Sequence, residues 1–220
     1  MNKKIFDQGS QSRAAHAAYN FGEIYPVQML AEIPKQGVAM DIGTGVGRDA
    51  VAMHNRVNGR LLVVGIDPDE SNYYKAVETY PQKDIVLCHD WAAVAAVKRN
   101  RQIAYLVAEV QKLEEPPSNL KADFINCSAV MMFIPRDEQQ DFLHGLHSLA
   151  KPLRDVFLRY RTEMLKNGMT SINQRILFNQ CYLAGFAMRK LPDFPDPPPS
   201  SRDFVWHDYL LTACCKPKFF

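Results

Sequence analysis

Residues 38–50 read VAMDIGTGVGRDA and carry the clearest pattern in the sequence. A short apolar run is followed by an acid, then by three glycines at alternate positions, and then by a charged pair. The apolar run has the length of a buried strand, and residues 49–57 behind the glycines have a helical pattern. A strand, a glycine turn and a helix in this order predict the ligand-binding corner of an α/β sheet.

The acid in this stretch, Asp41, bears on the charge of the ligand. Glycine turns of this kind usually cradle phosphate. Two unit charges about 4 Å apart interact by about 4 kcal/mol at an effective dielectric of 20, so a carboxylate opposes a pyrophosphate and favours a cation. The dinucleotide fingerprint G-x-G-x-x-G/A is also broken, because Arg48 stands at its third small position and Gly47 comes one place early.

The rest of the chain predicts strands that alternate with helices. Further strands are expected at residues 61–67, 104–109, 122–128, 155–160, 186–191 and 204–213. The clearest helix follows Pro135, with Asp137 as its N-cap and Gln140 reaching back. This alternation predicts an α/β fold, a doubly wound, mostly parallel, seven-stranded sheet with helices on both faces. No linker divides the chain, so we expect a single domain over residues 1–220.

Composition and charge narrow the class of protein. A net charge of +2 is too small to argue for nucleic acid or a membrane surface as a partner. The start, MNKKIFDQGSQSR, lacks the apolar core of a signal peptide, and no apolar run approaches the roughly 20 residues of a bilayer span. Five cysteines without a C-x-x-C spacing fit a reduced, cytoplasmic chain with no metal site.

Four segments in order resemble the class I S-adenosylmethionine-dependent methyltransferases. DIGTGVGRDA (41–50) is similar to the family's cofactor loop, and VVGIDPDE (63–70) to its ribose-binding strand end. AYLVAEVQKL (104–113) is similar to its third strand, and ADFINCSAVMMFIPRDEQQDFLHGLHSLAKP (122–152) to its fourth strand and the helix that follows. The family also ends in an antiparallel pair at the sheet edge, which matches residues 186–213, so the resemblance implies an antiparallel last strand.

The resemblance implies S-adenosylmethionine as the cofactor and a set of residues that bind it. In this family, the counterpart of Asp67 meets the ribose hydroxyls, while that of Glu109 meets the adenine amine with Val110 against the ring. Asp90 is a rival for the adenine contact, although its spacing suits the family less well. The residues expected to bind the cofactor are Asp41, Gly43, Thr44, Gly45, Gly47, Asp67, Pro68, Glu109, Val110 and Ser128.

The chain departs from the family at three places. Phe133 stands where close relatives often carry a histidine, so a catalytic role of that histidine is lost or moved. Leu153 and Arg154 replace a glycine pair after Lys151-Pro152, so that turn must differ. The segment between Asp67 and Glu109 is also long.

The resemblance implies in-line transfer of a methyl group, and we expect a small-molecule acceptor. No N-P-P-[YF] tetrapeptide follows the fourth strand, and the net charge is low, which together argue against a nucleic-acid substrate. The candidates for a catalytic role are Tyr19 and His16, in an N-terminal helical lid segment over residues 1–35, and Arg161.

Three alternatives remain open at this stage. The first is a methyltransferase acting on a protein or an RNA. The second is a non-catalytic S-adenosylmethionine-binding protein that regulates a partner, which Phe133 makes conceivable. The third is a Rossmann oxidoreductase, which Asp41 and Arg48 disfavour.

Overall fold

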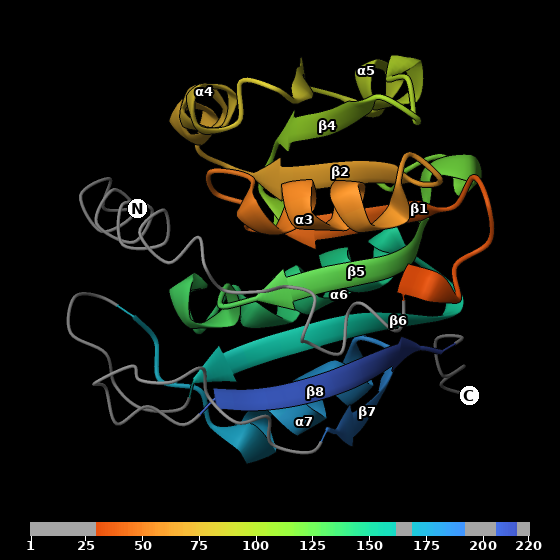
Figure 1. Cartoon of the computed structure of the whole chain (residues 1–220). Coiled ribbons are helices and arrows are strands. Elements are labelled where there is room, and N and C mark those ends of the chain that lie inside the picture. The colour runs from red at the N-terminus through yellow and green to blue at the C-terminus, as the bar shows by residue number, and fades with distance from the viewer. Residues whose placement is uncertain (1–29, 162–168, 192–205, 215–220) are drawn as a thin grey trace. The chain divides into compact units, whose positions relative to one another are not determined.

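The computed structural model describes residues 30–161, 169–191 and 206–214. The chain divides into two compact units, Met1–Ala108 and Glu109–Phe220, which are called unit 1 and unit 2 and are described separately. The described residues form eight strands, four in each unit, with helices between them (Figure 1). The α/β class is confirmed, and the strand count is eight rather than the expected seven.

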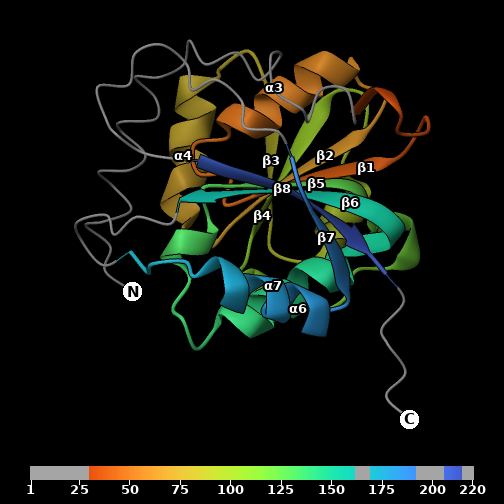
Figure 2. The same cartoon turned by 90° about the horizontal axis from the view of Figure 1, so that it is seen from below.

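Unit 1 contains a parallel four-stranded arrangement in the order β3-β4-β2-β1. Right-handed crossovers place α3 and α4 on one face of these strands and α5 on the other, and Figure 2 shows α3 and α4 on the same side. The elements are β1 (Val38–Ile42), α3 (Arg48–Val57), β2 (Leu62–Asp67), α4 (Glu70–Thr79), β3 (Asp84–Cys88), α5 (Trp91–Ala96) and β4 (Gln102–Val107).

The central strands of unit 1 are the most apolar part of the chain. Every residue of β1 and β2 is buried, as expected for parallel strands that are covered on both faces. The helices α4 and α5 each begin at an aspartate that caps the helix N-terminus. The Asp69 side chain accepts from the Ser71 N–H at 3.0 Å, and the Asp90 side chain accepts from the Ala93 N–H at 2.7 Å.

The strand β3 is the one that the sequence analysis missed. It lies at the edge of the unit 1 sheet and is only partly buried, so it lacks the continuous apolar run by which a central strand is recognised. Together with α5, it occupies the long segment between Asp67 and Glu109.

Unit 2 contains the strands in the order β5-β6-β8-β7. The pair β5–β6 is parallel, while β8 runs antiparallel to both β6 and β7, which confirms the antiparallel last strand. The helices α6 and α7 lie side by side (Figure 2). The elements are the 3₁₀ turns η2 (Val110–Lys112), η3 (Ser118–Leu120) and η4 (Met131–Phe133), with β5 (Ala122–Ser128), α6 (Gln139–Leu149), β6 (Ala150–Arg161), α7 (Gln174–Leu183), β7 (Phe186–Lys190) and β8 (Trp206–Ala213).

Two local expectations in unit 2 need correction. The N-cap of α6 is Glu138 and has no side-chain capping bond, so the expected Asp137–Gln140 cap is wrong; Gln140 instead donates to the Gln180 carbonyl at 3.2 Å. The strand β6 also begins earlier than expected, and Leu153 within it has a φ of 61° with 73% of the residue exposed. Leucine thus adopts the left-handed conformation that glycine accommodates at little cost.

Candidate functional site

The glycine loop of unit 1 lies at the carboxyl ends of β1 and β2. Its three glycines, Gly43, Gly45 and Gly47, have φ values of 65°, 53° and 80°, a region that favours glycine. The N–H groups of Gly43 and Thr44 both donate to the carbonyl of Ile66, at 2.8 and 3.2 Å. The loop is therefore fixed over the end of β2 before α3 begins.

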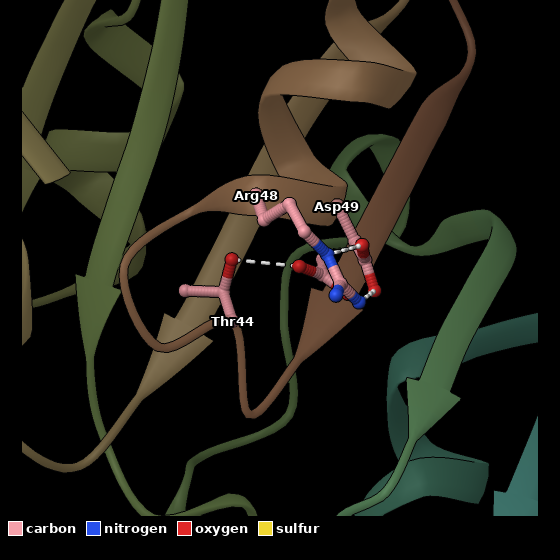
Figure 3. A network of polar contacts seen from close by, with 4 residues as sticks. Thr44, Arg48 and Asp49 are labelled. Atoms are coloured by element: carbon pink, nitrogen blue, oxygen red, sulfur yellow. Dashed lines mark hydrogen bonds and ion pairs between the residues drawn. The ribbon is translucent and has the colours of Figure 1, made fainter. Parts of the chain in front are cut away.

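Asp41 is buried beneath this loop, with 3% of its surface exposed. The Thr44 hydroxyl donates to its Oδ2 at 2.7 Å, and Figure 3 shows Arg48 and Asp49 pointing toward one another beside this bond. Arg48 Nε and Asp49 Oδ1 are 2.7 Å apart. Burial alone would lower the pKa of Arg48, but Asp49 and then Asp41 raise it, and the net shift is upward. The charge of Asp41 is thus partly offset by Arg48.

Asp67 joins the end of β2 to the glycine loop. Its Oδ2 accepts from the Gly45 N–H at 2.9 Å, and its Oδ1 accepts from the Asp69 N–H at 3.0 Å and from the Asn72 Nδ2 at 3.2 Å. Burial raises the pKa of Asp67, while these three donors oppose the rise by stabilising the carboxylate. The structure therefore brings together the loop and the acid that the sequence analysis placed in one site.

Two supporting contacts were missed by the sequence analysis. The hydroxyl of Tyr105, on β4, donates to the Gly45 carbonyl at 2.8 Å. Burial, and then the carboxylates around it, raise the Tyr105 pKa, so this hydroxyl stays protonated and can donate. At Gly65, a Cβ would lie 2.8 Å from Thr44 Cγ2, so only glycine lets the loop pack this closely on β2. Both contacts join segments far apart in sequence, and no local pattern indicates them.

The loop also borders open space. A Cβ built at Gly45 meets no atom of the described residues within 4 Å. Six of the nine acids in the described part of unit 1 lie at this same end of the strands; they are Asp41, Asp49, Asp67, Asp69, Glu70 and Asp90. A carboxylate-rich loop with a left-handed glycine facing open space suits a ligand that carries positive charge and donates hydrogen bonds.

In unit 2, Glu109 is the N-cap of η2, and Val110 is the first residue of this 3₁₀ turn. The Glu109 carboxylate lies 2.9 Å from Lys112 Nζ and accepts from Gln111 Nε2 at 3.1 Å. Val110 is buried, and Gly145 of α6 packs against it so closely that a Cβ there would lie 2.5 Å from the Val110 carbonyl oxygen. The absence of a side chain at position 145 therefore sets the position of the Val110 backbone.

Ser128 is the last residue of β5 and directly precedes a strained residue. The next residue, Ala129, has a φ of 62°, and its N–H donates to the Arg159 carbonyl at 2.8 Å. Beside it, Arg159 Nε and Asp208 Oδ1 are 3.0 Å apart and both side chains are buried. The distance makes an ion pair, although the N–H is not directed well enough at Oδ1 to be a hydrogen bond.

The other expected residues are placed as follows. Pro68 is exposed after β2, and Phe133 is half-buried in η4. Asp90, the rival of Glu109, caps α5. Tyr19 and His16 lie outside the described residues, as does the side chain of Arg161.

The described residues contain neither a candidate metal centre nor a candidate membrane-spanning helix. In this part of the chain, no group of three or more histidine, cysteine, aspartate or glutamate side chains could hold a metal ion. Nor does any helix in it have the length and hydrophobicity needed to cross a membrane.

The chain was compared with known proteins in sequence and in structure. No protein-family model and no curated protein matches it in sequence. Among solved structures, a TehB-like SAM-dependent methyltransferase from Corynebacterium glutamicum is 16% identical, with a TM-score of 0.63 over 96% of this chain and 100% of that one. The 1,6-didemethyltoxoflavin-N1-methyltransferase of Burkholderia thailandensis, solved with 1,6-didemethyltoxoflavin and S-adenosylhomocysteine bound, is 12% identical, with a TM-score of 0.63 over 96% of this chain and 87% of that one.

A third structure is longer than this chain. The CurJ carbon methyltransferase is 12% identical, with a TM-score of 0.59 over 84% of this chain. This chain spans about half of it, 51% of its length. At these identities the likeness concerns the fold: the chain has the fold of the S-adenosylmethionine-dependent methyltransferases.

Proposed function

We propose that this protein is an S-adenosylmethionine-dependent methyltransferase with a small-molecule acceptor. The observation that carries the proposal is the glycine loop, which holds buried carboxylates, Asp41 and Asp67, at the carboxyl ends of β1 and β2. S-adenosylmethionine carries an ammonium and a sulfonium, so the carboxylates attract it, whereas they would repel a pyrophosphate. Arg48 weakens this preference without reversing it, since two buried acids face one cation.

The residues of the loop fit this cofactor. A carboxylate has about four acceptor sites, and Asp67 uses three for protein donors, which leaves capacity for a ribose hydroxyl. The open space at Gly45 allows a ligand to approach the backbone. In unit 2, we assign Glu109 and Val110 to the adenine and Ser128 to the methyl-transfer site, as the resemblance implies.

The bound cofactor supplies an electrophilic methyl group, and the contribution of the chain is to bind and align it. The fixed loop, tied to β2 and β4, holds the two carboxylates in place before the ligand arrives. The small-molecule acceptor is supported by the 1,6-didemethyltoxoflavin bound to one structural neighbour. We further propose that residues 1–220 act as one domain, because the expected cofactor residues are divided between units 1 and 2.

We also propose that the protein works in the cytoplasm, because three of the described cysteines, Cys88, Cys181 and Cys214, are free thiols.

Transfer of a labelled methyl group to a panel of metabolites tests the enzymatic part of the proposal. We expect at least one small molecule to become labelled, and the Asp67→Asn variant to lose this activity through weaker binding of the donor. Tight binding of S-adenosylhomocysteine without transfer to any metabolite would contradict the proposal and favour a regulatory protein.

A further inference from the structure

The charges of unit 1 are segregated between the two ends of its strands. The described part of unit 1, residues 30–108, has nine basic and nine acidic residues and is therefore neutral overall. Six of the acids lie with the glycine loop at the carboxyl ends of the strands. Seven of the nine basic residues lie at the opposite, amino-terminal ends; they are Lys35, Arg56, Arg60, Lys83, Lys98, Arg99 and Arg101, and we call them the basic edge.

The basic edge is continuous in space. The Gln36 N–H donates to the Arg60 carbonyl at 3.0 Å, and Arg99 donates to the Gln36 carbonyl. A Cβ at Gly59 would lie 2.7 Å from the Asn100 carbonyl oxygen. The segments that begin β1, β2 and β4 thus touch one another, because parallel strands all start at the same edge of a sheet.

The cations of this edge are not neutralised by nearby acids. Three acids, Glu32, Glu78 and Asp84, lie toward the same end, yet none of the seven cations forms an ion pair within the described part of the chain. The acidic end is about 17–20 Å away, since β1 and β2 have five and six residues at about 3.3 Å each. This exceeds the screening length of about 10 Å at 0.1 M salt, so the two ends act as separate charges.

Structural roles explain only some of these cations. Arg60 donates to the carbonyls of Leu30 and Ala31, Lys83 bonds to Asn55, and Arg56 lies in the last turn of α3. The last turns of α4 and α5 carry no basic residue, so a preference for cations at helix ends does not account for the edge.

Three of the cations have no structural role. Lys35, Lys98 and Arg101 are exposed, and their side chains make no hydrogen bond or ion pair with any residue that the structure describes. They are held close together by the contacts between the segments that begin β1 and β4.

We infer that the basic edge binds the phosphodiester backbone of a nucleic acid. Arginine and lysine clusters of this kind bind phosphates, and arginine does so through paired N–H groups. A protein partner would call for apolar or aromatic side chains at the centre of the surface. The exposed large apolar residues of the described part of unit 1, Tyr74 and Val77, lie on α4, which contributes no residue to the basic edge. Phosphate contacts carry no sequence information, so binding is expected to be non-specific.

The small net charge of the chain, +2, does not exclude this binding. A total of +2 argues against nucleic acid only if the charges are spread evenly, and in unit 1 they are not. The proposed binding lies at the far end of the strands from the glycine loop, so it is independent of the cofactor and of the acceptor.

Fluorescence anisotropy with a labelled 20-nucleotide polyuridylate tests the inference, with polythymidylate as a second probe and phosphatidylserine vesicles as a third. We expect the full chain to bind both nucleic acids, more weakly as salt rises. The triple variant Lys35→Gln, Lys98→Gln, Arg101→Gln removes cations that have no structural role. The logarithm of the binding constant falls with the logarithm of the salt concentration, with a slope of about −0.7 for each phosphate contact on a single strand. Loss of three contacts therefore reduces the magnitude of the slope by about 2 and weakens binding about 100-fold at 0.1 M salt.

The matched control is Arg175→Gln, Arg189→Gln, Lys190→Gln, which removes the same charge from exposed positions of unit 2. It should retain most of the affinity, and both triple variants should bind S-adenosylhomocysteine as the unchanged protein does. Absence of nucleic-acid binding at 50 mM salt, equal weakening by the two triple variants, or binding to the vesicles alone would each overturn the inference. None of these outcomes depends on methyl transfer.

Discussion

Replacement of Tyr105 by phenylalanine removes one hydroxyl from beneath the glycine loop. This hydroxyl donates to the Gly45 carbonyl at 2.8 Å and is buried, so no water readily replaces it. The net contribution of such a hydrogen bond is about 1 kcal/mol, and we expect the free energy of unfolding to fall by about that amount. Urea denaturation measures the change.

The same substitution should weaken ligand binding at the loop. The hydrogen bond holds the loop in one conformation, and its loss allows others to be populated. If the binding-competent conformation is disfavoured by about 1 kcal/mol, the affinity for S-adenosylhomocysteine falls about fivefold. Isothermal titration calorimetry measures this affinity directly.

The matched control is Tyr73→Phe. The Tyr73 ring packs edge-on against Tyr105 at 5.6 Å, but its hydroxyl donates to the Ile85 carbonyl at 3.4 Å, away from the loop. We expect Tyr73→Phe to leave the affinity unchanged. A loss of stability without a loss of affinity in Tyr105→Phe, or equal weakening by the two variants, would contradict the role of this hydroxyl in holding the loop.

Three further substitutions test the packing and the charges. Leu153→Gly should raise the free energy of unfolding by about 1 kcal/mol in urea denaturation, because Leu153 is exposed and holds a left-handed conformation at that cost; an unchanged or lower stability would contradict this. Gly145→Ala should lower the free energy of unfolding by about 1 kcal/mol, because the clash with the Val110 carbonyl exceeds the gain in helix propensity. A more stable variant would show that α6 can shift. Burial, and then the charge of Lys83, lower the pKa of His54 in the folded protein. As pH drops below about 6.5, His54 therefore binds a proton more readily in the unfolded protein than in the folded one, and stability should fall. His54→Leu should remove this part of the pH dependence, and an unaltered pH profile would rule out His54 as its source.

The local features of the site could be predicted from the sequence. The loop residues are consecutive, and Asp67 ends the next apolar run, so short patterns place them in one corner of a parallel sheet. The hydrogen bond from the Gly45 N–H to Asp67 confirms that they lie together. The acid at position 69 also stands where an N-cap is expected, directly before α4.

The contacts between distant segments could not be predicted in this way. Tyr105 reads as one more apolar residue of a strand, and its hydroxyl finds Gly45 only because β4 lies beside β2. Gly65 gives no local signal of the close approach of Thr44. The edge strand β3 was missed because it is short and half-exposed, and the basic edge was hidden because its members come from four separate segments of the sequence.

The charge preference of the glycine loop is tested most directly by calorimetric titration of the unchanged protein and of Asp41→Asn with S-adenosylhomocysteine and with NADH. Asparagine keeps an acceptor for the Thr44 hydroxyl and removes only the charge. We expect S-adenosylhomocysteine to bind the unchanged protein, NADH not to bind, and Asp41→Asn to weaken S-adenosylhomocysteine at least about tenfold, or about 1.4 kcal/mol. Binding of NADH in preference to S-adenosylhomocysteine, or equal affinity of the variant for S-adenosylhomocysteine, would contradict the assignment of the loop to a cationic ligand.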